Sequence, residues 1–339
     1  MKIEENEQIN FSPSGEKSED DFFNEVVKIP ETTWKKIAVS GVLQFDKERG
    51  KQILQSFTDL DGRSALGILK MAGIDTSNLI YVRPGKYLEG AVNLDTGDKF
   101  GVVYDEETQT AFFDHHAKGI ITSTTKIVYK AMMNLQRSKK TDLAIGLKPI
   151  EKTEAMDKLV DFVTKIDNRQ FPPEEFLKSA KTILGLCFQK DLDFNKLLAY
   201  FKEHASPMEE LTIEELEKYG LKDSAEKQQK IIDGAMETLE RMEKEGKIID
   251  TKYGKIVINK NNELKVGSSA AYVKFDGIIN ITPEKSFAVT LKEGKFDEEE
   301  LKNKLGDKFQ GKIIRGNMWI YNDKEPLNLS MEELINSLK

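Results

Sequence analysis

The chain has 339 residues, a formal net charge of −7, three histidines and one cysteine. The negative charge argues against a long duplex as partner, because duplex binding needs many cations on phosphates. One cysteine excludes an intramolecular disulfide and a thiolate zinc cage, and Cys187 lies in an apolar run typical of a core. Neither an apolar run of about 18 residues nor a signal-peptide pattern is visible, so we expect a cytoplasmic protein with no membrane partner.

Residues 1–33 are acidic and polar, which predicts a flexible tail. Over 34–222, short apolar runs alternate with helical periods, which predicts an α/β domain with a mostly parallel sheet flanked by helices. A helix is expected around residues 65–71, and another begins at Ser123 or Thr124 as N-cap. The expected strands of this domain cover residues 36–40, 53–58, 79–83, 90–94, 101–104 and 110–113.

Residues 151 to about 220 predict further helices, followed by a long amphipathic helix over 223–245 that Gly246 ends. We interpret residues 223–247 as a connector between two domains, with a coiled-coil arm as the alternative. Residues 248–339 predict a smaller α+β domain, in which Trp319 is expected to be core. Its expected strands cover residues 247–251, 253–259, 270–275, 277–282, 286–291 and 312–321, with a helix at 296–306.

Acidic residues and two adjacent histidines follow the ends of the expected elements of the first domain. These residues are Asp59, Asp61, Asp95, Asp114, His115, His116 and Asp167. In an open α/β sheet, ligands bind at the carboxyl ends of strands. Carboxylates with one or two imidazoles suit Mn²⁺ or Mg²⁺, and two such ions would clamp both oxygens of a phosphoryl transfer. Each motif alone is also explained as a turn or a helix end; the ordered set is the specific signal.

The order DxDG, an aspartate at a strand end, DHH and a further aspartate resembles the DHH phosphoesterase superfamily. That superfamily includes RecJ single-strand exonucleases, oligoribonucleases, cyclic-dinucleotide phosphodiesterases and family II pyrophosphatases. The resemblance implies a DHH-type catalytic domain over 34–222 and a substrate-binding C-terminal domain. It implies two Mn²⁺ ions, with Mg²⁺ as the alternative, and a set of metal ligands: Asp59, Asp61, Asp95 as the bridge, His115 and Asp167. His116 would face the phosphate as acid or anion binder, and Asp114 would orient a ligating imidazole.

Two features depart from the superfamily pattern. Gln55 stands where many members carry a histidine four residues before the first aspartate, and the C-terminal domain has Gly267-Ser268-Ser269 in place of a glycine-rich GGGH-type loop. Arginine offers paired donors to phosphate, and a lysine offers a point charge. The candidate phosphate contacts are therefore Arg63, Lys118, Arg169 and Arg315, each equally explained as a surface cation.

The function implied is hydrolysis of phosphodiester bonds by a hydroxide that two metal ions activate. The substrates would be small nucleotides, short single-stranded oligonucleotides or cyclic dinucleotides. One alternative is a pyrophosphatase-like phosphoanhydride hydrolase. Another is a catalytically silent binding or regulatory protein, which Gln55 and the missing glycine-rich loop favour. The sequence leaves open the substrate, the direction of cleavage and the oligomeric state, including a homodimer.

Overall fold

The computed structural model describes residues 24–46, 51–97, 99–116, 121–138, 146–261, 263–281, 286–309, 311–314, 316–321 and 329–339. The backbone divides into two compact units, residues 1–168 with 193–198 and residues 169–192 with 199–339. Residues 169–192 and 199–222 therefore group with the C-terminal unit, whereas the sequence analysis assigned them to the first domain. The functional bounds of the two domains stay a prediction.

Five strands form the main sheet of the first unit, in the order β4-β1-β5-β7-β6. Their bounds are Leu79–Val82, Ile37–Ser40, Val92–Leu94, Thr110–Asp114 and Gly101–Asp105. Strand β1 is parallel to β4 and β5, and β5 is parallel to β7, whereas β6 is antiparallel to β7. All residues of β5 and β7 are buried, as expected for inner strands of a parallel sheet. The predicted α/β class with a mostly parallel sheet is confirmed.

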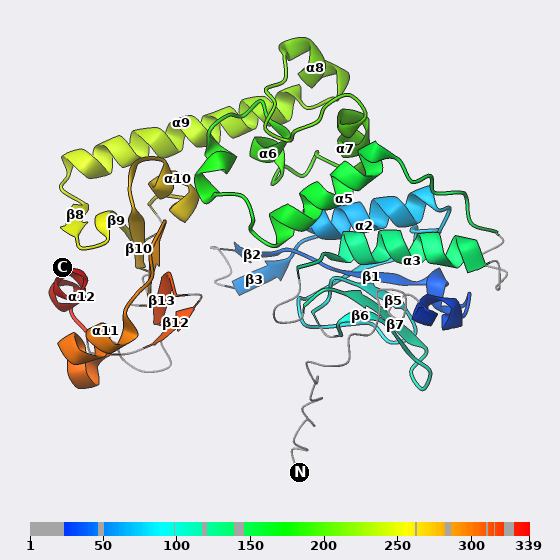
Figure 1. The fold of residues 1–339 in the computed structure, drawn as a ribbon, viewed down its shortest axis with the longest axis horizontal. Helices are drawn as coiled ribbons and strands as arrows, with labels where there is room; N and C mark the ends of the chain where they lie inside the picture. The colour runs from blue at the N-terminus through cyan, green and yellow to red at the C-terminus, as the bar shows by residue number, and fades with distance from the viewer. Residues whose placement is uncertain are drawn as a thin grey trace, which may run out of the picture. The chain divides into compact units, whose positions relative to one another are not determined.

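Three helices lie together on one face of this sheet (Figure 1). They are α2 (Leu60–Met71), α3 (Thr124–Ser138) and α5 (Glu154–Asp167). Side chains cap all three: Asp59 accepts from the backbone of Gly62, Ser123 from Lys126 and Thr153 from Met156. The sheet begins just after two short 3₁₀ helices, η1 (Asn24–Lys28) and η2 (Thr33–Lys35), in a segment whose Val26, Ile29 and Trp34 are buried.

The predicted strand at 53–58 is wrong in its bounds. Strand β3 (Lys51–Leu54) pairs antiparallel with β2 (Leu43–Asp46) in a separate two-stranded sheet. The hairpin is closed at its base, because Val42 N donates to Phe57 O at 3.0 Å and Gln55 N donates to Val42 O at 2.9 Å. The chain therefore leaves β1, forms the hairpin, and returns to the end of β1 just before Asp59.

Most of the chain between the five-stranded sheet and the six-stranded sheet of the C-terminal unit is helical. Its further helices are η3 (Pro173–Leu177), α6 (Ile183–Leu186), α7 (Phe194–Phe201), α8 (Ile213–Lys218) and α9 (Lys222–Lys244). The predicted long helix is thus confirmed as a single helix of 23 residues. Gly246 follows its last turn with a φ of 69°, a left-handed conformation that glycine adopts at low cost. Cys187 is buried as predicted.

The C-terminal unit contains a six-stranded sheet in the order β12-β13-β11-β10-β9-β8. The bounds, in that order, are Lys312–Ile314, Met318–Tyr321, Phe287–Leu291, Gly277–Ile281, Gly254–Lys260 and Ile248–Thr251. Successive side chains point to opposite faces, so Val257 and Ile278 pack with Leu239 of α9 in one core. Ile256 and Ile279 pack with Trp319 in the other core. Short helices complete the unit: α11 (Glu298–Leu305), η4 (Gly306–Lys308) and α12 (Met331–Leu338).

Two strand predictions in this unit are wrong. Residues 270–275 belong largely to a helix, α10 (Gly267–Lys274), rather than to a strand. Ala270, Ala271 and Tyr272 are buried in succession while Val273 and Lys274 are exposed, which is not the alternation of a strand. The predicted strand at 312–321 is a hairpin, because the chain turns between β12 and β13. Over the described residues, no helix is long and apolar enough to cross a bilayer.

Candidate metal centre

The carboxyl ends of neighbouring parallel strands bring the acidic motifs together. Asp95 follows β5 directly, and its backbone N donates to Phe113 O of β7 at 3.0 Å. Asp95 has a φ of 55°, a left-handed conformation that aspartate tolerates better than most residues. Asp114 is the last residue of β7, and His115 and His116 follow it. The turn after each strand thus directs its polar residues to one edge of the sheet.

Asp61 is held by the N-terminus of α3. Its two carboxylate oxygens accept from the backbone N of Thr124 and of Thr125, both at 2.8 Å. The Thr125 hydroxyl donates to the backbone O of Asp61 at 2.9 Å. A negative charge is favourable at this end of a helix, where backbone N–H groups lack partners. Thr124 and Thr125 are positioning residues that sequence reasoning missed, although the TSTT stretch does signal a helix start.

His115 lies at the middle of the acidic cluster and is mostly buried. Its Nε2 is 3.2 Å from Asp95 Oδ1 and 3.7 Å from Asp61 Oδ2, and its Nδ1 is 3.3 Å from Asp167 Oδ2. Burial alone would lower the pKa of His115, but the carboxylates of Asp95, Asp61 and Asp167 raise it to about 9. A proton on His115 offsets part of the negative charge of the surrounding carboxylates.

Asp114 and His116 form a pair at the rim of the cluster, with His116 Nδ1 3.9 Å from Asp95 Oδ1. The fully buried Asp114 accepts from the backbone N of Gly97, and from the backbone N and the ring Nδ1 of His116 at 3.0 and 2.6 Å. Burial alone would raise the pKa of Asp114, but these hydrogen bonds from His116 and Gly97 lower it. The bond to Asp114 raises the pKa of His116, whose side chain is 51% exposed. Asp114 thus orients the imidazole that faces solvent.

The acidic residues around His115 repel one another. Burial, helped by the neighbouring carboxylates, raises the pKa of Asp95 to about 8 and that of Asp167 to about 7. Loss of surrounding water and the charge of Asp61 also raise the pKa of Asp59. Like charges held this close favour protonation unless a cation lies among them.

The donor set fits a divalent metal. Among the described residues, His115 Nε2 and Asp167 Oδ2 are buried without a hydrogen-bond partner. Two groups of ligand atoms lie within 4.8 Å of one another, Asp95 with His115 and His116, and Asp61 with His115 and Asp167. Carboxylate oxygens with an imidazole nitrogen are suitable ligands for Mn²⁺ or Mg²⁺. A cation between them would satisfy the two orphaned atoms and neutralise the repulsion.

The other predicted site residues lie as follows. The Asp59 carboxylate accepts from Gly62 N at 3.0 Å as the N-cap of α2, and Asp59 belongs to neither group of ligand atoms. A side chain at Gly62 would meet the Thr58 hydroxyl at 2.2 Å, which explains the glycine of DxDG. Arg63 lies in the first turn of α2.

Of the remaining three candidate cations, the structure describes one. Arg169 is exposed, with a φ of 53°. Lys118 and Arg315 lie outside the described residues.

The sequence matches no protein-family model, and a comparison with curated proteins gives no match. Among solved structures, the chain is similar to RecJ from Thermus thermophilus in complex with Mn²⁺, with 11% identity and a TM-score of 0.44 over 89% of this chain and 52% of RecJ. RecJ from Thermus thermophilus in complex with Mg²⁺ gives 12% identity and a TM-score of 0.42 over 89% of this chain and 50% of RecJ. An uncharacterized protein from Helicobacter pylori G27 gives 12% identity and a TM-score of 0.26 over 89% of this chain and 97% of that protein.

The chain therefore spans about half the length of the two RecJ chains. These values describe a likeness of fold alone.

Proposed function

We propose that the chain is a metal-dependent phosphoesterase of the DHH type. Its substrates would be small nucleotides, short single-stranded oligonucleotides or cyclic dinucleotides. One observation carries the proposal: Asp61, Asp95 and Asp167 surround His115 at the carboxyl edge of a parallel sheet, and the buried His115 Nε2 and Asp167 Oδ2 lack hydrogen-bond partners among the described residues. Both atoms lie in ion pairs, at 3.2 Å from Asp95 and 3.3 Å from His115, but in geometries that make no hydrogen bond, so a metal ion would give each of them a better partner.

The proposed ligands are Asp59, Asp61, Asp95, His115 and Asp167, with Asp95 as the bridge between two Mn²⁺ ions and Mg²⁺ as the alternative. Bound there, the ions would supply an activated hydroxide and neutralise charge on the phosphate. Thr124 and Thr125 fix both oxygens of Asp61, so this ligand is oriented in advance. The Asn168 amide donates to Thr122 O at 2.7 Å, which ties the end of α5, and with it Asp167, to the segment before α3.

His116 is proposed to act on the phosphate. Because the carboxylate of Asp114 accepts from His116 Nδ1 at 2.6 Å, that nitrogen carries the proton and Nε2 is left for the substrate. The raised pKa of His116 favours its protonated form, which can donate to a phosphate oxygen. Asp114 is proposed to support this role by fixing the ring, and not by touching the substrate.

The phosphate contacts proposed for substrate binding are Arg63, Lys118, Arg169 and Arg315, the last from the C-terminal substrate-binding domain. The acidic chain as a whole, with a net charge of −7, favours short substrates over long nucleic acid. A hydrolysis assay with several substrates tests this length preference and the identity of the substrate, independently of a measurement of metal binding.

The test is a hydrolysis screen of the Mn²⁺-loaded protein with pyrophosphate, linear dinucleotides, cyclic dinucleotides and short single strands. We expect release of nucleotides that is abolished by EDTA and by Asp95→Ala. Asp75→Ala is the matched control, because Asp75 is an exposed aspartate in a turn with Ser77. Release of phosphate from pyrophosphate alone would support the phosphoanhydride hydrolase, and no turnover of any substrate would support the binding protein.

A further inference from the structure

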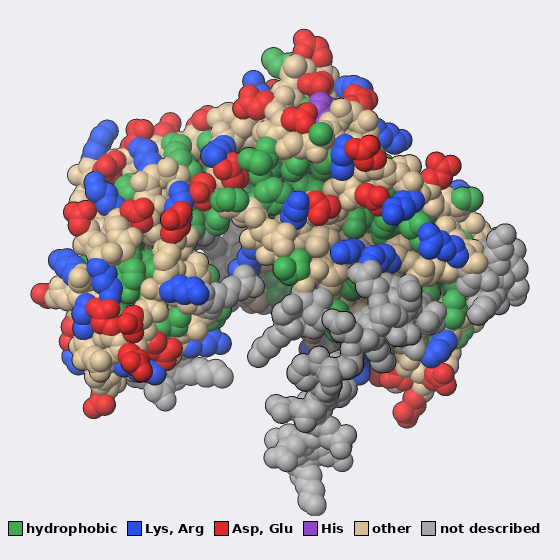
Figure 2. Space-filling model, viewed as in Figure 1, with side chains coloured by type: hydrophobic (Ala, Val, Ile, Leu, Met, Phe, Trp, Pro, Cys, Tyr) green, Lys and Arg blue, Asp and Glu red, His purple; other side chains and the backbone are tan. Residues whose placement is uncertain are grey.

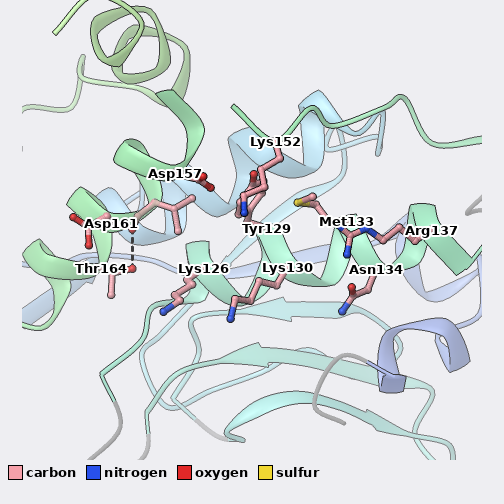
Figure 3. A pocket seen from close by; sticks show the side chains of 11 residues that line it. Lys126, Tyr129, Lys130, Met133, Asn134, Arg137, Lys152, Asp157, Asp161 and Thr164 are labelled. Carbon is pink, nitrogen blue, oxygen red and sulfur yellow. Dashed lines mark hydrogen bonds between the residues drawn. The ribbon is translucent and has the colours of Figure 1, made fainter. Parts of the chain in front are cut away.

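A cavity of about 360 Å³ lies between α3 and α5 (Figure 3). Four cations line it: Lys126, Lys130, Arg137 and Lys152. The first three come from α3, where spacings of four and seven residues place side chains on one face of a helix. None of the acidic or imidazole residues of the metal centre lines this cavity.

The cavity is cationic on a chain that is acidic overall. Against its four cations stand two carboxylates, Asp157 and Asp161. The Asp161 carboxylate forms an ion pair with Lys165 at 2.8 Å, which leaves Asp157 as the main negative group facing the cavity. In the space-filling view, Lys and Arg side chains gather over α3 (Figure 2). A local positive surface on a chain of net charge −7 indicates an anionic ligand.

Tyr129 supplies a second, independent observation. Its side chain lines the cavity and is only 5% exposed, and among the described residues its hydroxyl has no hydrogen-bond partner. A buried hydroxyl without a partner is costly, and a polar ligand group in the cavity would give it one. Burial and the charge of Asp157 raise the pKa of Tyr129 to about 12, so its hydroxyl is a donor at neutral pH.

We propose that the α3–α5 cavity binds a small phosphorylated molecule that carries hydroxyl groups, such as a sugar phosphate or a mononucleotide. The cations bind the phosphate, and the Tyr129 hydroxyl donates to one of its oxygens. Asp157 and the amide of Asn134 accept from the hydroxyl groups. The volume is at the lower end of the range of about 300–1,000 Å³ for small-molecule pockets, which favours one small molecule over a polymer.

The test measures binding of ribose 5-phosphate to the full chain by calorimetry, with ribose and inorganic phosphate as reference probes. We expect one site that persists after EDTA treatment and in Asp167→Ala, because the cavity does not need the metal centre. The double variant Lys130→Ala/Arg137→Ala should bind at least about tenfold more weakly. Lys158→Ala is the control on α5, since Lys158 pairs with Glu154 and does not line the cavity. Its affinity should equal that of the wild type.

Tyr129→Phe separates a ligand contact from a mere packing defect. Removing an unpaired hydroxyl should not lower the unfolding temperature of the ligand-free protein, while the affinity for ribose 5-phosphate should fall about tenfold. Three results would overturn the proposal. They are equal affinity in the wild type and both cavity variants, loss of binding with EDTA or in Asp167→Ala, and binding of a short single strand without any binding of ribose 5-phosphate.

Discussion

Asn259 in the C-terminal unit and Asp61 in the first unit are almost equally buried, with 1% and 2% of their surface exposed. Asn259 accepts from Leu264 N at 2.8 Å and donates to Asn280 Oδ1 at 2.8 Å and to Leu264 O at 3.3 Å. Its donors and acceptors are neutral and complementary. Asp61 instead lies beside His115 in a cluster with Asp95 and Asp167, where charges of one sign predominate.

The difference is between a buried polar group whose partners are neutral and complementary and a buried cluster in which like charges lie close together. The Asn259 network satisfies itself, as buried polar groups of a scaffold do. The cluster around His115 leaves two buried atoms without hydrogen-bond partners among the described residues and raises the pKa values of Asp95 and Asp167. A substitution should therefore affect stability in the first region and metal binding in the second.

The largest effect is expected for Asp95→Ala. This variant should bind fewer Mn²⁺ ions per chain, since a bridging ligand serves both ions. Its turnover should fall by roughly 10²- to 10³-fold, the scale of losing one preorganised electrostatic contact. Metal analysis and initial rates measure both quantities, with Asp75→Ala as the control. Undiminished metal uptake would show that Asp95 only forms a turn.

The two adjacent histidines should differ from each other. His115→Ala should weaken both metal binding and activity, because His115 lies among three carboxylates. His116→Ala should bind metal nearly as the wild type does and turn over roughly 10²-fold more slowly, the scale of a general acid–base contribution. Metal titration and initial rates of each variant test the assignment. Wild-type metal binding and activity in both variants would make the pair structural.

A smaller effect is expected for Asn259→Ala, and it concerns stability instead of metal binding. The change leaves the backbone N of Leu264 and the amide oxygen of Asn280 without their partner. The free energy of unfolding should fall by about 1–3 kcal/mol, while the number of Mn²⁺ ions bound stays that of the wild type. Denaturant unfolding and metal analysis check the two halves of this expectation. Loss of metal from this variant would contradict the assignment of stability to the Asn259 network and of metal binding to the cluster around His115.

The smallest effect is a pH dependence of stability in the metal-free protein. Folding raises the pKa of His115 to about 9, of Asp95 to about 8 and of Asp167 to about 7. Groups whose folded pKa is raised stabilise the fold while protonated, and this stability is lost between the unfolded and the folded pKa: from about pH 4 to about 7 or 8 for the two aspartates and from about 6.5 to about 9 for His115.

The unfolding temperature of the metal-free protein should therefore fall by several degrees from pH 5 to pH 9, at about 2–4 °C per kcal/mol. Addition of Mn²⁺ should remove most of the decline, and Asp167→Asn should reduce it in the absence of metal. A decline that is identical with and without Mn²⁺ would place its origin elsewhere in the chain.

The positions of most motif residues could be predicted because they depend on local signals. Ser123 caps α3 as its residue type indicates, Asp95 follows a buried strand, and the histidine pair follows β7. The hairpin of β2 and β3 could not be predicted from periodicity, since its closure depends on pairing of Val42 with Phe57 and Gln55. Because of this hairpin, Asp59 lies near the end of β1 although it does not follow β1 directly in the sequence.

Other features could not be predicted from the sequence because they depend on tertiary contacts. The stretch 270–275 has the aromatic and β-branched content of a strand, but burial against α9 and neighbouring elements stabilises it as a helix. The bonds from Thr124 and Thr125 to Asp61 join residues more than 60 positions apart. The cations of α3 have the pattern of a solvated face, and only the packing of α5 shows that they line a cavity.

The most direct test of the central claim is a crystal structure of the Mn²⁺-soaked protein with anomalous diffraction data collected at the manganese absorption edge. The account predicts anomalous peaks among Asp61, Asp95, His115 and Asp167, with Asp95 Oδ1 and His115 Nε2 no longer in direct contact. An empty centre at saturating Mn²⁺, with His115 still between the three carboxylates, would contradict it.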